Sequence, residues 1–392
     1  MKQICDNKKV NRIIFDLALL VYAGLLFYLY YNQLLFPVTG RFESDTAIHV
    51  RFAVEDHYYH SLAAFIYVFL SWLPFSEILI ATVLTIATVG AIIGTKFLIL
   101  KLISLYDFKM SDITVNIIAF SSNILMAFYI KSANSNHYIG YECANMWHNS
   151  TYTFMKVFAI FTVIYFIDAY NSYKEEKLGK KFYIYSILLT VTTGFKASFL
   201  TVFAPFLALL LLRDLIKKTP FMKVFAFALS IIPSLIVLLC QNMVLSSDSG
   251  NGYAISPFTA LALRGAHPKI TLVLSVLFPL LIFFTHIKDF YKDKVYFSTL
   301  IFTGIAFMEV FLLVETGERS LDGNFMWGYS IALFFLFLIS IIKALKDFAQ
   351  RRDANKVFAG MVLSVEMLIL FWHVLTGIIY FFILLTGVTY FA

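Results

Sequence analysis

The sequence is short of charge. Only 14% of its 392 residues are Asp, Glu, Lys or Arg, against about 25% in an average soluble domain. Hydrophobic residues make up 60% of the chain, and a single soluble core stops growing at roughly 250–300 residues. This scarcity excludes one large soluble domain, so lipid is the remaining solvent for the apolar surface.

The chain also lacks cysteine motifs, repeats and low-complexity segments. Its three cysteines, Cys5, Cys143 and Cys240, have no metal-binding spacing. A Cys143–Cys240 disulfide is geometrically conceivable near an outer face, but we expect two free, buried thiols. No small-residue cleavage site follows the first apolar run, which is long enough to remain as a signal anchor. We therefore treat residues 1–392 as a single integral membrane domain.

Long apolar runs are what the sequence has instead. A helix that spans a bilayer needs about 17–25 apolar residues. Candidate runs lie at 12–37, 77–100, 113–131, 151–169, 182–195, 197–212, 224–244, 270–287, 295–314, 327–345 and 357–391. The last could form a hairpin of two short helices or one long tilted helix. These runs predict an all-α, polytopic membrane helical bundle with about 11 or 12 transmembrane helices.

Lysine and arginine set the expected orientation. They cluster between apolar runs, so membrane topology explains the net charge of +7 better than nucleic-acid binding does. If the short run 58–73 does not span, all clusters fall on one side, at residues 8–12, 101–109, 174–181, 213–223, 288–294 and 343–356. We therefore predict a cytoplasmic N-terminus, with 58–73 as an interfacial helix in a first extracytoplasmic loop at 38–76.

The predicted outer loops hold the unusual polar side chains. Loops at 38–76, 132–150, 245–269 and 315–326 contain six of the eight histidines. The first loop begins with Glu43-Ser44-Asp45, a pair of carboxylates that suits a general base with a supporting partner, or ligands of a divalent cation. Any chemistry is therefore expected at the outer face.

Cations in these outer loops run against the inside bias and need a reason. Charge-assisted binding of a phosphate or pyrophosphate group is one, and pairing with nearby carboxylates or lipid head groups is the alternative for each residue alone. The candidates are Lys196, Arg264, Lys269 and Arg319. Aromatic and polar side chains in the same loops suit a sugar-binding pocket, although tryptophan also suits an interfacial belt. The candidates for this role are His57, His148, Asn324 and Trp327.

This pattern resembles the GT-C class of membrane glycosyltransferases. Members of that class have about a dozen spans and use a lipid-phosphate sugar donor. The loop after their first span carries interfacial helices and a modified Asp-x-Asp motif, often Glu-x-Asp. The matching features here are Glu43-Ser44-Asp45, the segment 58–73 and the paired short runs around Lys196. The resemblance covers the architecture of most of the chain, without matching a named subfamily or showing a soluble outer domain.

The resemblance implies a function. Asp45 would be the catalytic base, and Glu43 would support it or position the acceptor. The implied reaction is an inverting transfer of a hexosyl or pentosyl group from a polyprenyl phosphate to a cell-envelope glycan or glycolipid. It would take place at the extracytoplasmic face of a bacterial plasma membrane. Lys196, Arg264, Lys269 and Arg319 would hold the leaving phosphate. The resemblance requires no cofactor and leaves a divalent cation, Mg²⁺ or Mn²⁺, open.

Two other classes compete with this interpretation. A polymerase or ligase of undecaprenyl-diphosphate-linked polysaccharides would depend on Arg264, His267 and Arg319 and would tolerate loss of Asp45. A transporter or flippase of lipid-linked sugars would use carboxylates within spans, for which Glu309 and Glu366 are the candidates. The two halves of the sequence show no matching pair of Gly- or Pro-broken helices, which counts against transport.

Overall fold

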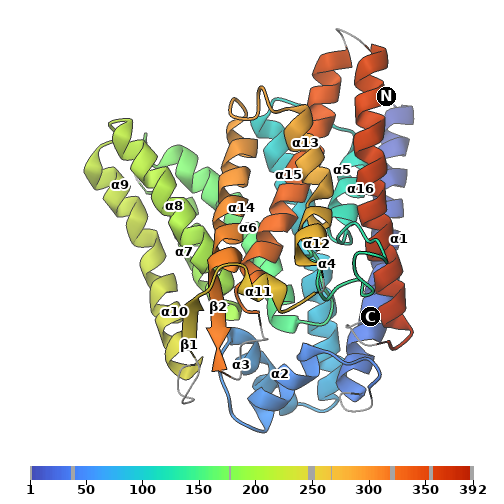
Figure 1. Cartoon of the computed structure of the whole chain (residues 1–392), viewed down its shortest axis with the longest axis vertical. Coiled ribbons are helices and arrows are strands. Elements are labelled where there is room, and N and C mark those ends of the chain that lie inside the picture. Colours follow the sequence, from blue (N-terminus) through green and yellow to red (C-terminus); the bar gives the residue numbers. More distant parts are fainter. Residues whose placement is uncertain are drawn as a thin grey trace.

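The computed structural model describes residues 2–36, 40–175, 178–245, 252–265, 267–317, 323–352 and 356–388. These residues form an all-α polytopic helical protein with one small sheet (Figure 1). The helices are α1 (Lys2–Leu35), α2 (Asp45–Val54), α3 (Leu62–Ser71), α4 (Ser76–Leu105), α5 (Asp112–Ser122), α6 (Ser150–Ser172), α7 (Lys180–Phe195), α8 (Ser198–Ile216), α9 (Phe221–Ala228), α10 (Ile232–Leu245), α11 (Thr259–Ala262), α12 (Pro268–Ser275), α13 (Leu277–Thr285), α14 (Lys294–Leu312), α15 (Met326–Arg352) and α16 (Lys356–Leu385). A 3₁₀ turn, η1 (Leu229–Ile231), joins α9 to α10.

Within the described ranges, eight helices are long and apolar enough to cross a membrane, or up to nine if the bent pair α12–α13 is one span. This count confirms a multi-pass membrane protein but is lower than the 11 or 12 predicted. The run at 182–195 forms the 16-residue α7, and the run at 357–391 contains a single 30-residue helix, α16. The run at 113–131 departs furthest from its predicted length, because only a short helix forms there.

The prediction of a full span at 113–131 is wrong. Only α5 forms there, and its 11 residues reach about 16 Å, far less than a bilayer core. The chain continues to residue 149 without regular structure, although much of it is buried. Asn123 ends the helix, where its side-chain Nδ2 donates to Ala119 O at 2.8 Å and to Thr95 Oγ1 at 2.9 Å. Side-chain bonds of this kind compete with continued helix.

The last helix holds this irregular segment and the α12–α13 break together. The bend between α12 and α13 is 64°. His373 on α16 lies against both: its Nδ1 is 2.7 Å from Met126 O, and its Nε2 accepts from Phe278 N at 3.4 Å. Gly377, one turn further on, lets the backbone of Ile124 approach closely, because a Cβ there would lie 1.9 Å from Ile124 O. Backbone groups that leave helical bonding are thereby satisfied inside the protein.

The two ends of the bundle differ. The N-terminus and the ends of helices that carry the basic loops lie at one end, and α2 and α3 lie at the other (Figure 1). The ten-residue α3 reaches only about 15 Å, too short to span, in line with the predicted helix at 58–73. Beside α10, β1 (Gly252–Ile255) pairs with β2 (Leu313–Thr316) in an antiparallel sheet that joins the chain after α10 to the end of α14.

The carboxylate Glu366, predicted within the last run, lies in a buried polar cluster. Thr285 Oγ1 donates to its Oε1 at 2.9 Å, and His286 Nε2 lies 3.7 Å from the same atom. His286 Nδ1 is 2.9 Å from Asp347 Oδ2, which also accepts from Lys343 Nζ at 2.7 Å. The cluster joins α13, α15 and α16. Through these contacts Glu366 helps to hold α13, α15 and α16 together, a structural role that is separate from the transport role considered from the sequence.

Candidate functional site

The Glu43-Ser44-Asp45 motif forms the start of α2. Ser44 caps this helix by accepting from Thr46 N at 2.9 Å. The carbonyl oxygen of His148 then accepts three bonds from the same turn: Ser44 Oγ at 3.2 Å, Thr46 N at 3.1 Å and Thr46 Oγ1 at 3.1 Å. The first loop is therefore fastened to the segment before α6, although a hundred residues separate them in sequence.

Asn149 connects the Asp45 carboxylate to the start of α6. As the N-cap residue of α6, its Oδ1 accepts from Tyr152 N at 2.9 Å and from Thr151 Oγ1 at 2.8 Å. Its Nδ2 therefore points the other way and donates to Asp45 Oδ2 at 2.8 Å. The capping bonds fix the orientation of the amide, so the carboxylate of Asp45 is oriented by a donor that cannot rotate away.

Charge around Asp45 favours its ionised form. Burial raises the pKa of the Asp45 carboxyl, whereas His148 and His49 in their protonated forms, the Asn149 hydrogen bond and the Lys196 ammonium lower it, and the net pKa lies below its usual range. Burial lowers the pKa of His148 to about 4 and that of His49 to about 3, so both imidazoles are neutral at pH 7. The Asn149 hydrogen bond and the Lys196 ammonium therefore stabilise the carboxylate at neutral pH.

Lys196 and Trp327 lie at the same place. Lys196 is the C-cap residue of α7, and its Nζ donates to Thr151 Oγ1 at 3.0 Å. The same ammonium lies 4.3 Å from the centroid of the Trp327 ring, at the start of α15. The His148 ring lies 6.3 Å from that of Trp327, so three of the predicted residues are neighbours. This arrangement provides a cation and an aromatic face beside Asp45.

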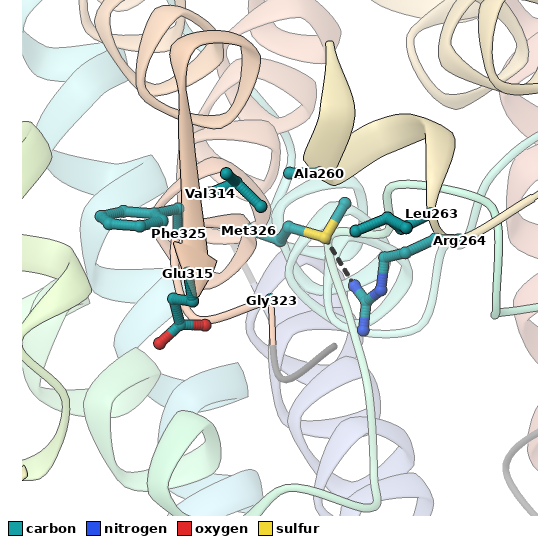
Figure 2. A pocket seen from close by; sticks show the side chains of 8 residues that line it. All are labelled: Ala260, Leu263, Arg264, Val314, Glu315, Gly323, Phe325 and Met326. Atoms are coloured by element: carbon teal, nitrogen blue, oxygen red, sulfur yellow. Dashed lines mark hydrogen bonds between the residues drawn. The ribbon is translucent and has the colours of Figure 1, made fainter. Parts of the chain in front are cut away.

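Arg264 lines a small cavity next to this cluster (Figure 2). Its Nη1 lies 2.7 Å from the sulfur of Met326, and Figure 2 shows Glu315 on the opposite side of the cavity. Both carboxylate oxygens of Glu315 accept from Asn324, one from its backbone N at 3.0 Å and one from its Nδ2 at 2.8 Å. Asn324 is thus bonded to protein, and the cavity, about 10 Å³, holds no more than a water in this conformation.

The structure shows no hydrogen bond or ion pair between Asp45 and the remaining predicted residues that it describes, and one of them lies outside the described residues. Glu43 is partly buried, and Lys269 is exposed in the first turn of α12. His57 is exposed, with its Nδ1 3.2 Å from the Tyr59 hydroxyl. Arg319 lies outside the described residues. Within the described ranges, no group of three or more His, Cys, Asp or Glu residues could hold a metal ion.

The cluster contains residues that the sequence analysis did not assign to it. His49 lies one helical turn after Asp45 on α2, a spacing that could have indicated a shared face. Asn149 is a residue type favoured at helix N-caps, but no pattern in the sequence connects it to Asp45. The cysteines lie elsewhere: Cys143 is buried and Cys240 exposed, and both are free thiols.

Comparison of this chain with family models, with curated proteins and with solved structures found no match.

Proposed function

We propose that this chain is a membrane glycosyltransferase of the GT-C type. It transfers a sugar from a polyprenyl-phosphate donor to a glycan or glycolipid acceptor, with inversion, at the end of the bundle that carries α2 and α3. The observation that carries the proposal is the Asp45 carboxylate, kept ionised at neutral pH by Asn149 and Lys196 and oriented by a capped amide. A base of this kind needs both features.

In the proposed reaction Asp45 accepts the proton of an acceptor hydroxyl as that oxygen attacks the anomeric carbon. The bond between this carbon and the phosphate oxygen breaks, and polyprenyl phosphate leaves with the electron pair. Lys196 and Arg264 supply positive charge for the leaving phosphate, which needs no general acid. In this proposal the ring of Trp327 and the neutral imidazole of His148, whose centroids lie 6.3 Å apart, contact the sugar.

The Asp45→Asn substitution tests the proposal. It keeps the size and hydrogen-bonding geometry of the side chain but removes the base. The full chain in lipid nanodiscs would receive a panel of undecaprenyl-phosphate hexoses and pentoses with a membrane glycolipid extract as acceptor. Release of undecaprenyl phosphate is measured by mass spectrometry. We expect the rate to fall by about a hundredfold or more.

Asp56→Asn is the matched control, since Asp56 is an exposed aspartate between α2 and α3. It should transfer at the wild-type rate. Full activity in Asp45→Asn would remove the base assignment. It would leave the polymerase or ligase of diphosphate-linked glycans, which the same assay detects as release of undecaprenyl diphosphate from lipid-linked oligosaccharides.

A second candidate, a flippase of lipid-linked sugars, gains support from one observation. Two membrane segments are broken, at the end of α5 and between α12 and α13, and both breaks meet at His373. Broken helices with polar junctions are typical of transporters. Movement of an unaltered polyprenyl-phosphate sugar across proteoliposomes, undiminished in Asp45→Asn, would favour this function over transfer.

A further inference from the structure

The proposed mechanism leaves one buried carboxyl group unused. Glu142 belongs to the irregular segment between α5 and α6, and its side chain is only 6% exposed. Its backbone N donates to Ser275 Oγ at 2.9 Å, which fixes the residue against the end of α12. A buried carboxyl group is costly when ionised unless a cation lies near it. The nearest candidate is Arg264, on the segment that precedes α12.

The segments of Glu142 and Arg264 touch through glycine. A Cβ on Gly140 would lie 3.1 Å from Arg264 O and 3.3 Å from Gly265 Cα, so the two backbones can approach only because both positions lack side chains. Gly140 also has a φ of +91°, which glycine adopts without strain. The segment of Glu142 therefore lies directly beside that of Arg264, whose positive charge acts on the buried Glu142 carboxyl.

Arg264 is not committed to an acidic partner in the described part of the chain. Its guanidinium contacts the sulfur of Met326, and Glu315 across the cavity is bonded to Asn324 instead. Glu142 interacts with it by charge, without an ion pair within 4 Å. The charge of Arg264 is therefore available to an anion that approaches its guanidinium, and Glu142 is the nearby group that would compete for this charge.

We infer that Glu142 is a proton-linked counter-ion that sets how tightly Arg264 binds the phosphodiester of the donor. This inference rests on the proposed function. When Glu142 is neutral, the charge of Arg264 is available to the donor. When Glu142 is ionised, it shares that charge and repels the incoming phosphate. Donor binding and proton uptake by Glu142 are therefore coupled, and each must favour the other to the same extent.

Several other titratable groups lie near Glu142 and Arg264, and their pKa values decide which of them can change charge near pH 7. Burial raises the pKa of Glu142 to about 7, and Arg264 lowers it from a still higher value. The groups that act on Glu142 or Arg264 come from three further places: Tyr138, Cys143 and His148 on the irregular segment, Tyr329 on α15, and Glu315 on β2. His148 stays neutral between pH 6 and 8, because burial lowers its pKa to about 4. Burial also raises the pKa values of Tyr138 and Cys143 above this range.

The sign of the effect follows. A bound phosphodiester places a negative charge beside Arg264, which raises the pKa of Glu142 further. The donor is then bound most tightly below pH 7 and more weakly as the pH rises through neutrality. If the donor raises that pKa by about one unit, its dissociation constant increases by about fivefold between pH 6 and pH 8.

The test measures binding rather than transfer. The full chain in nanodiscs is titrated with undecaprenyl phosphate glucose, a phosphodiester whose charge is constant over this range, at pH 6, 7 and 8. The variants are Glu142→Gln, which removes the titrating proton, and Arg264→Gln, which removes the cation. Asp45→Asn is a further variant, expected to abolish transfer and to leave the pH dependence of binding unchanged.

We expect wild-type binding to weaken with pH, Glu142→Gln to bind tightly at every pH, and Arg264→Gln to bind weakly at every pH. Equal wild-type affinity at pH 6 and 8, or a pH dependence that persists in Glu142→Gln, would overturn the inference and leave the proposed function standing. Failure of the wild type to bind any phosphodiester of the donor panel would instead contradict the proposed function itself. Thermal unfolding of each variant identifies any that does not fold. For Glu142 the Glu142→Asp variant then replaces Glu142→Gln, with a shifted but retained pH dependence expected.

Discussion

At the scale of single residues, Asn149 shows how structure and reactivity depend on one side chain. Its carbonyl oxygen caps α6, and its amide nitrogen binds Asp45. The two bonds cannot be exchanged by rotating the amide, because a backbone N–H requires an acceptor and the carboxylate requires a donor. Substitutions at this position can therefore remove one contact while keeping the other.

Two substitutions of Asn149 both remove the amide donor to Asp45 but differ at the cap. Asn149→Ala also removes the capping oxygen and should lower the free energy of unfolding by about 1 kcal/mol. Asn149→Asp keeps a capping oxygen but places a second carboxylate against Asp45, and this repulsion raises the pKa of Asp45 and lowers the stability of the fold. Because Asp45 loses the donor that orients it, Asn149→Asp should transfer sugar about tenfold or more slowly at pH 7. Thermal unfolding and the undecaprenyl phosphate release assay check this, and wild-type activity in Asn149→Asp would contradict the role given to that bond.

The candidate site could be predicted from the sequence only in part. Asp45, Lys196 and Trp327 each stood out locally, as an acid in a loop, a cation on the wrong side and an aromatic at a helix start. The sequence did not predict that these residues lie close together, because their proximity depends on Asn149 and on the His148 carbonyl, which are far from Asp45 in sequence. His57 was selected by the same local rule and is exposed at the edge of its loop.

At the scale of elements, the contact between α16 and the irregular segment after α5 is the tightest described. Gly377 lies so close to Ile124 that its missing side chain is a packing requirement. His373 satisfies backbone groups on two broken segments from the same helix face. Apolar runs predicted most helices correctly, because length and hydrophobicity select spans. They failed at 113–131 because apolar residues such as Ile124, Leu125 and Met126 can be buried in a helix or in an extended segment. The hydrogen bonds of Asn123, which end the helix, cannot be predicted from composition.

The close packing at Gly377 can be tested by substitution to alanine, with Gly360 on the same helix as the control. In Gly377→Ala the new methyl group would lie 1.9 Å from Ile124 O, so the backbone must move. We expect a loss of about 2 kcal/mol or more in the free energy of unfolding. A Cβ on Gly360 of α16 meets nothing within 4 Å, and Gly360→Ala should be neutral or gain about 0.5–1 kcal/mol. Thermal unfolding in detergent measures both, and equal melting temperatures would contradict the close packing.

At the scale of the whole molecule, the basic loops and the proposed site lie at opposite ends. The basic loops lie with the N-terminus, while Asp45 and its neighbours lie with α2 and α3 (Figure 1). The positive-inside rule predicts that the first end faces the cytoplasm. This asymmetry could be predicted from the sequence because it depends on many lysines and arginines together rather than on any single contact.

Cysteine labelling tests this orientation. In a variant without native cysteines, Asp56→Cys and Lys217→Cys place single exposed thiols at opposite ends of the bundle. A membrane-impermeant maleimide added to intact cells should label Asp56→Cys and should reach Lys217→Cys only after lysis. The reverse pattern would place the Asp45 site on the cytoplasmic face and contradict the proposed direction of transfer.

The dependence of the α5 segment on α16 has a consequence for how the protein is made. The chain is synthesised from its N-terminus, so Met126 and the backbone after α5 enter the membrane long before His373 and Gly377 exist. Until the last helix is inserted, those backbone groups lack their final hydrogen-bond partners, and the surrounding lipid cannot replace them. The loop that carries His148 and Asn149 can therefore reach its working shape only when translation is nearly complete. Chains truncated before α16 should be recognised by membrane quality control as unfinished, however many of their earlier helices are in place.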